Sequence, residues 1–110
     1  MSDIFPEPIL KLPVADMPWE GVSGYLSQST AHQILFTEYT KDVEMPEHSH
    51  GTEWGVVLEG KMEMVVEGVK RTYSKGDRYF IPAGVPHSVK VYAGYADITF
   101  FDQEDRYQPK

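Results

Sequence analysis

Short runs of apolar, aromatic and β-branched residues make up most of the chain, and glycine-containing turns separate them. No stretch repeats its apolar residues with the period of about 3.6 that marks an α-helix. The sequence predicts β-strands over residues 33–39, 61–66, 69–73, 78–81, 85–92 and 95–101. Glu67-Gly68 and Ala93-Gly94 predict tight turns between consecutive strands. Many short strands joined in this way predict an all-β sandwich or barrel.

Composition limits the classes of function that the chain can serve. Its 110 residues are enough for one domain with a single core. The formal charge of −7 disfavours nucleic acid and anionic membrane surfaces as partners. The absence of cysteine excludes disulfides, thiolate nucleophiles and zinc-thiolate sites. There is neither a membrane-length apolar run nor a signal-like start over residues 1–12, so we expect a cytoplasmic protein.

The two ends of the chain differ in character from its middle. Residues 1–20 contain four prolines and no helical periodicity, which predicts an extended N-terminal arm with at most one short strand. Residues 21–102 are predicted to form the barrel. Residues 103–110 are predicted to form a polar tail, in which Arg106 and Tyr107 are the residues able to dock against the barrel.

Three of the four histidines lie in two short segments, residues 46–53 and 76–87. Alternate residues of a strand point to the same side, so we expect His48 and His50 to share a face. Glu53 follows a two-residue turn and begins the next strand, and His87 comes from a strand that a closed barrel can place beside them. Three imidazoles and a carboxylate form a suitable ligand set for one divalent metal ion.

The two segments resemble the two sequence motifs of the cupin superfamily, in particular the small single-domain cupins with an RmlC-like jelly-roll barrel. The first motif is a glycine, a His-x-His pair, a glutamate and a second glycine. The second motif is a glycine, Pro-x-Gly, a histidine and an asparagine. The matching residues are His48, His50, Glu53 and Gly60 in the first motif and Gly76, Pro82, Gly84 and His87 in the second.

Three features of the chain depart from these motifs. Asp42 stands where the first motif opens with glycine, and Val91 stands where the second motif ends in asparagine. We expect Val91 to face the same interior as His87. Only two residues separate His50 from Glu53, one fewer than usual. Glu53 can therefore be either a metal ligand or a residue that contacts the ligands, and the sequence leaves this choice open.

The resemblance implies an all-β, double-stranded β-helix (jelly-roll) barrel that pairs into a homodimer, often by exchange of N-terminal strands. It also implies one divalent ion (Fe, Mn, Ni, Co or Zn) at His48, His50, Glu53 and His87, beside a pocket for a small organic molecule. We expect a metal-dependent enzyme, with dioxygenase-type chemistry as the leading reaction. The alternatives are a metal-dependent isomerase or lyase, a non-catalytic metal- or ligand-binding sensor barrel, and a metal-free barrel with vestigial histidines.

Several other residues bear on these alternatives. The basic residues Lys61, Lys70, Arg71 and Lys75 are expected at exposed positions, which disfavours a sugar-phosphate substrate. Tyr79, Asp97 and His32 are candidates for polar groups near the metal, although His32 lies outside both motifs and is expected at the surface. Large apolar residues are expected to divide between the core and the pocket; they are Trp54, Met62, Met64, Tyr79, Phe80, Phe100 and Phe101.

Overall fold

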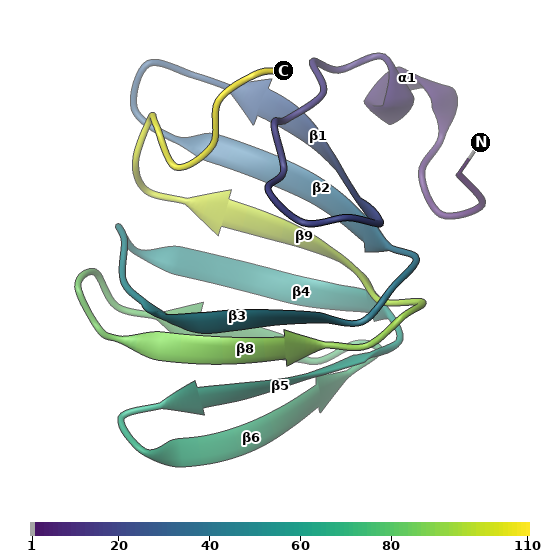
Figure 1. Ribbon diagram of the computed structural model, residues 1–110. Helices are drawn as coiled ribbons and strands as arrows, with labels where there is room; N and C mark the ends of the chain where they lie inside the picture. The colour runs from purple at the N-terminus through teal and green to yellow at the C-terminus, as the bar shows by residue number, and fades with distance from the viewer. Residues whose placement is uncertain (1) are drawn as a thin grey trace.

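The structure, a computed structural model, describes residues 2–110. Two antiparallel β-sheets lie face to face, and the chain crosses between them repeatedly (Figure 1). The elements are α1 (Glu7–Leu10), β1 (Val22–Gln28), β2 (Gln33–Tyr39), β3 (Val43–His48), β4 (Glu53–Glu59), β5 (Lys61–Val66), β6 (Val69–Ser74), β7 (Arg78–Ile81), β8 (His87–Val91) and β9 (Ala96–Phe101). This arrangement confirms the predicted all-β jelly-roll barrel.

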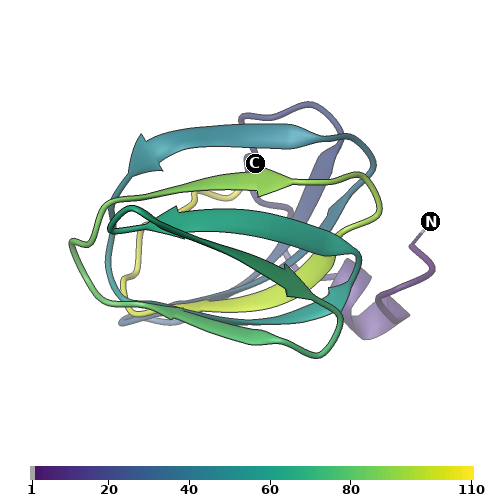
Figure 2. The ribbon, with the colours of Figure 1, turned by 90° about the horizontal axis from the view of Figure 1, so that it is seen from below.

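The sheets have five and four strands. The larger has the order β1-β2-β9-β4-β7, and the smaller has the order β3-β8-β5-β6. Consecutive strands such as β2 and β3, or β8 and β9, belong to opposite sheets, so strands distant in sequence become neighbours. Figure 2 shows the two sheets facing each other across the interior of the barrel.

Most predicted strands are found where the alternation of residues placed them. β2, β5 and β7 have the predicted bounds, and β5 turns into β6 through Glu67 and Gly68, both with positive φ. β1 was not among the predicted strands. Its sequence, VSGYLSQ, mixes serine and glycine with few β-branched residues, and it becomes a strand by pairing along its whole length with β2.

The N-terminal arm, predicted to be extended, is not extended over its whole length. Residues Glu7–Leu10 form one α-helical turn, α1, that follows Pro6 and includes Pro8. Proline is compatible with the first turn of a helix, because the amide hydrogen that it lacks would have no intrahelical partner there. A helix of one turn is too short to show apolar periodicity, so the sequence pattern does not reveal it.

Both ends of the chain pack beside β1 and β2 (Figure 1). Phe5 is buried, with its ring edge-on to those of Tyr25 and Phe36. Ala15 pairs with Pro109 in an isolated bridge, so that the N-terminal arm and the C-terminal tail also contact each other. The domain boundaries at residues 20 and 102 stay predictions.

Alternation along the strands separates an inner face from an outer face. The inner residues form a core of Tyr39, Val43, Met45, Val57, Met62, Met64, Tyr79, Ile81, Val91 and Tyr95. Side chains alternate between the two faces of a strand, and the neighbours of Trp54 and Phe80 in sequence point inward. Trp54 and Phe80 therefore project from the outer face, with 44% and 60% of their surfaces exposed. In residues 2–110, no helix is long and apolar enough to cross a membrane.

Candidate metal centre

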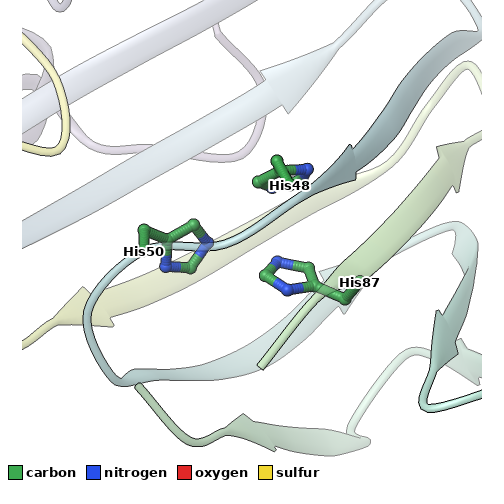
Figure 3. Close-up of side chains that lie close together, drawn as sticks. All are labelled: His48, His50 and His87. Carbon is green, nitrogen blue, oxygen red and sulfur yellow. The ribbon is translucent and has the colours of Figure 1, made fainter. Parts of the chain in front are cut away.

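The three motif histidines meet at one end of the barrel (Figure 3). His48 is the last residue of β3 and lies opposite His87, the first residue of β8, in the register of these paired strands. His50 lies in the turn between β3 and β4. One donor nitrogen from each ring lies within 4.8 Å of the others. Two atoms bound to one ion at about 2.1 Å are at most about 4.2 Å apart, so small ring movements would bring these donors onto a single metal.

The expectation that His48 and His50 share the face of one strand is wrong in its geometry. A register irregularity lies between Met45 and His48, and β3 ends at His48. His50 therefore reaches the cluster from the turn, with its ring centroid 5.4 Å from that of His48 and 4.8 Å from that of His87. The turn after β3, and not alternation along a strand, thus places the His50 ring beside those of His48 and His87.

Each of the three rings is oriented by its own backbone. Nδ1 of His48 lies 2.8 Å from the carbonyl oxygen of Pro46. Nδ1 of His50 lies 2.8 Å from the carbonyl oxygen of Gly51, and Nδ1 of His87 lies 3.0 Å from that of Val85. A carbonyl oxygen only accepts hydrogen bonds, so each Nδ1 carries the hydrogen. In the neutral ring Nε2 then has a free lone pair, which is the form that binds a metal.

Glu53 begins β4, as predicted, and its buried carboxylate points at the cluster. Its Oε1 lies 3.1 Å from Nε2 of His50 and 3.9 Å from Nε2 of His87. An ionised carboxylate and an unprotonated Nε2 are both acceptors. Such a contact is favourable only when a proton or a metal ion lies between the two atoms, so the donor set fits a bound cation.

A small cavity extends from the histidines into the barrel interior, with about 50 Å³ open to the centres of water-sized molecules. His48, Glu53 and His87 lie at one end of it. The four-stranded sheet contributes an apolar wall of Met45, Met62, Met64, Val89 and Val91. The five-stranded sheet contributes a more polar wall that includes Thr37, Tyr79, Asp97 and Thr99. Met17 from the arm and Tyr107 from the tail complete the lining.

The polar wall is centred on Asp97. Its carboxylate accepts hydrogen bonds from the hydroxyl groups of Thr37, Tyr79, Tyr95 and Thr99. Sequence reasoning named Tyr79 and Asp97 as candidate polar groups but did not find the threonines or Tyr95. A signal was available, because Thr37, Asp97 and Thr99 occupy the inward-facing positions of predicted strands, where apolar residues are expected.

Burial shifts the pKa values of these groups. It lowers the pKa of His87, where the Val85 carbonyl and Glu53 act in the opposite direction. It raises the pKa of Asp97, against the effect of the hydrogen bonds from Thr37, Tyr95 and Tyr79. Burial also raises the pKa of Tyr79 well above its ordinary value. His87 is thus held neutral, as metal binding requires, and Tyr79 keeps its proton.

The fourth histidine lies apart from this cluster, as expected. His32 forms a hydrogen bond with Ser29 and stacks on Phe100, on the outer face of the larger sheet.

The two substituted positions of the cupin motifs have defined surroundings in the structure. Asp42 accepts a hydrogen bond from the backbone of Ala93 at the β8–β9 turn, and Val91 lies in the buried core with His87 on the same inner face.

Comparisons with known proteins agree with this description. The cupin domain family matches residues 35–101. An RmlC-like cupin from Shewanella frigidimarina superposes with a TM-score of 0.75 at 20% identity, over 96% of this chain and 94% of that one. KdgF from Halomonas sp. superposes with a TM-score of 0.69 at 19% identity, over 83% and 87%.

A larger protein shares the same barrel. A single-residue variant of the oxalate decarboxylase of Bacillus subtilis superposes with a TM-score of 0.72 at 16% identity, over 87% of this chain but only 28% of its own. Among curated proteins, no sequence matches the chain significantly. The family match spans more than half of the chain, the two sheets have the jelly-roll arrangement, and three motif histidines converge inside the barrel. On these grounds the protein belongs to the cupin domain family.

Proposed function

We propose that the protein is a metal-dependent enzyme that acts on a small organic molecule, with one divalent ion held by His48, His50, His87 and Glu53. The observation that carries this proposal is the set of three Nδ1 hydrogen bonds, which leaves all three Nε2 atoms available near the Glu53 carboxylate. When bound, the ion would polarise an oxygen atom of the substrate, and iron would add redox chemistry with dioxygen.

Dioxygenase-type chemistry remains the reaction that we favour, since four protein ligands leave coordination positions for a substrate and a second reactant. A lyase or decarboxylase is the second candidate. It is supported by the similarity of the barrel to oxalate decarboxylase, a protein described with Mn(II) centres. A non-catalytic sensor or storage barrel is the third candidate.

A phosphorylated substrate has no support in this chain, because the basic residues that could bind a phosphate are at exposed positions. They are Lys61, Lys70, Arg71 and Lys75.

The test is metal content, measured by elemental mass spectrometry on untagged protein purified without oxygen. We expect about one metal per chain in the wild type. His48→Ala and His87→Ala should each lose most of it, whereas His32→Ala, which removes the histidine outside the cluster, should retain it. Iron together with oxygen uptake would support dioxygenation, and manganese, nickel, cobalt or zinc would favour the lyase.

Thermal unfolding provides an independent check of the same site. A ligand that binds only the folded state at about 100 times its dissociation constant adds about 2.7 kcal/mol of stability. Metal addition should therefore raise the melting temperature of the wild type and of His32→Ala, and a chelator should reverse the effect. If metal is absent and no metal shifts the melting temperature, the proposal of a metal-dependent enzyme is wrong.

We also propose a homodimer as the assembly. The arm is packed on its own sheet through Phe5, and exchange of arms between two chains would form the same contacts with the partner's sheet.

A further inference from the structure

Asp97 is a buried carboxylate surrounded by neutral hydroxyl groups. Tyr79 and Tyr95 donate to its Oδ2 at 2.7 and 2.6 Å, and Thr37 and Thr99 contact its Oδ1. When ionised, a carboxylate offers about four lone-pair positions, which these four donors fill, and their hydrogen bonds favour the ionised form against the effect of burial on the Asp97 pKa. Asp97 therefore fixes the directions of the hydroxyl hydrogens around it.

This arrangement determines what the polar wall can offer to a ligand. The hydrogen of the Tyr79 hydroxyl is directed at Asp97, so the lone pairs of the tyrosine oxygen remain as acceptors. The Thr99 hydroxyl, whose Oγ1 lies 3.2 Å from this oxygen, directs its own hydrogen at Asp97 and so leaves these lone pairs open. Tyr79 lines the same cavity as His48 and His87. The Tyr79 hydroxyl therefore faces this cavity as an acceptor of hydrogen bonds.

The position of Tyr79 depends on Gly55. A Cβ atom at residue 55 would lie 2.3 Å from Cζ and 2.4 Å from the hydroxyl oxygen of Tyr79. Glycine weakens a strand interior and marks places where another group approaches closely. Here the group that approaches is the phenol ring, so the backbone of β4 is suited to holding this hydroxyl in the interior.

We propose that Tyr79, held by Asp97, accepts a hydrogen bond from a hydroxyl group of a short hydroxy acid whose carboxylate binds the metal ion. This inference rests on the proposed function, because the ion is the other anchor of the ligand. Tyr79 contacts the ligand, and Asp97 is a positioning residue that acts through Tyr79. The cavity is small, with about 50 Å³ open to the centres of water-sized molecules, which suits a short acid.

The cavity chemistry supports a ligand with one polar group at each end. The wall opposite Tyr79 carries Met45, Met62 and Met64, which pack against carbon atoms and donate no hydrogen bonds. A hydroxyl group that enters this cavity without reaching an acceptor would lose its hydrogen bonds to water. Tyr79 should therefore favour the hydroxylated acid over the same acid without its hydroxyl.

The experiment compares 3-hydroxypropionate with propionate as ligands of the cobalt-loaded protein, by calorimetry and by the visible absorption of cobalt. We expect the wild type to bind 3-hydroxypropionate about tenfold more tightly, the effect of one buried hydrogen bond. Tyr79→Phe should reduce this preference to less than about twofold with cobalt affinity unchanged. Asp97→Asn should reduce it as well, because an amide no longer accepts all four hydroxyl hydrogens.

The matched control is Tyr73→Phe. It removes a hydroxyl from the β6 ring that packs against Tyr79, with centroids 5.7 Å apart, and it should leave the preference unchanged. An unchanged preference in a folded Tyr79→Phe protein would overturn the inference, and so would failure of both acids to bind the cobalt-loaded wild type. Failure of the wild type to bind cobalt would instead reject the proposed metal site. If Tyr79→Phe does not fold, an unchanged preference in Asp97→Asn overturns the inference.

Discussion

At the scale of single residues, the centre is organised by which nitrogen of each histidine carries its hydrogen. Carbonyl oxygens of residues next to or near each histidine accept the Nδ1 hydrogen, and no distant element is required for this. Fixed rings reduce the conformational freedom that is lost when a metal binds. The neutral state of the rings then becomes a condition for both stability and metal affinity.

The first prediction concerns His87 and pH. Burial lowers its pKa, so the folded protein binds this proton less readily than the unfolded chain, in which histidine has a pKa of about 6.5. The stability that results is complete above that value and is lost as the pH falls through it toward the lower pKa of the folded state. Metal-free wild type should therefore unfold at a lower temperature at pH 5 than at pH 7.5.

His87→Gln provides the comparison for this prediction, because glutamine is polar and does not titrate. Urea unfolding measured across this pH range should show a weaker pH dependence in the variant than in the wild type. Equal pH dependence in the two proteins would show that His87 is not the group responsible. Metal affinity should fall over the same range in the wild type, because the ligands must be deprotonated to bind.

At the scale of elements, β4 contributes both a candidate ligand and the space for the polar wall. Glu53, Gly55 and Val57 share its inner face, and the same strand pairs with β9 and β7. Glu53 lies at the level of the histidines, Gly55 lies opposite Tyr79, and Val57 lies opposite Asp97. One strand thus connects the metal end of the cavity to the cluster around Asp97.

The second prediction, at this scale, is that Gly55→Ala destabilises the protein by about 1–3 kcal/mol, as expected for an added group in a packed interior. The cause is the contact of the new Cβ with the ring of Tyr79. A double-mutant cycle with Tyr79→Leu, analysed by urea unfolding, should show a coupling of similar size, since leucine removes the hydroxyl and the ring end. Additive effects of the two substitutions would contradict this cause.

At the scale of the whole molecule, both termini help to close the barrel. Gln33 is fully buried, and its side chain bonds both backbone groups of Tyr107: Nε2 donates to the carbonyl at 2.8 Å, and Oε1 accepts from the amide at 3.0 Å. Tyr107 in turn packs edge-on against Phe101 and lines the cavity. The tail therefore docks on the barrel through Tyr107, one of the two tail residues that the sequence indicated for this role.

The third prediction concerns removal of residues 103–110. Loss of Tyr107 would leave the buried amide of Gln33 without these partners, at a cost of about 1–3 kcal/mol, and the lost packing of its ring adds to this. We expect the shortened protein to be less stable by at least about 2 kcal/mol in urea. Gln108→Ala, at an exposed tail position, should have little effect. Unchanged stability after truncation would favour the predicted barrel boundary at residue 102.

Local patterns in the chain were enough to predict the fold class and to propose the residues of the candidate centre. Alternating strands separated by turns are local patterns, so the bounds of β2, β5 and β7 could be predicted from the sequence. The spacing of His48, His50, Glu53 and His87 indicated a metal site because both motifs are short and contiguous. These inferences needed no knowledge of how the sheets face each other.

The remaining features emerge only from the assembled sheets, because they depend on contacts between residues far apart in sequence. Asp97 is joined to Thr37 and Tyr79 across 60 and 18 residues, and Gln33 to Tyr107 across 74. A polar residue on an inward-facing position signals a conflict with burial, but its partners are defined only when the strands come together. The position of His50 also depends on the tertiary structure, because β3 ends at His48 and the turn that follows places the His50 ring in the cluster.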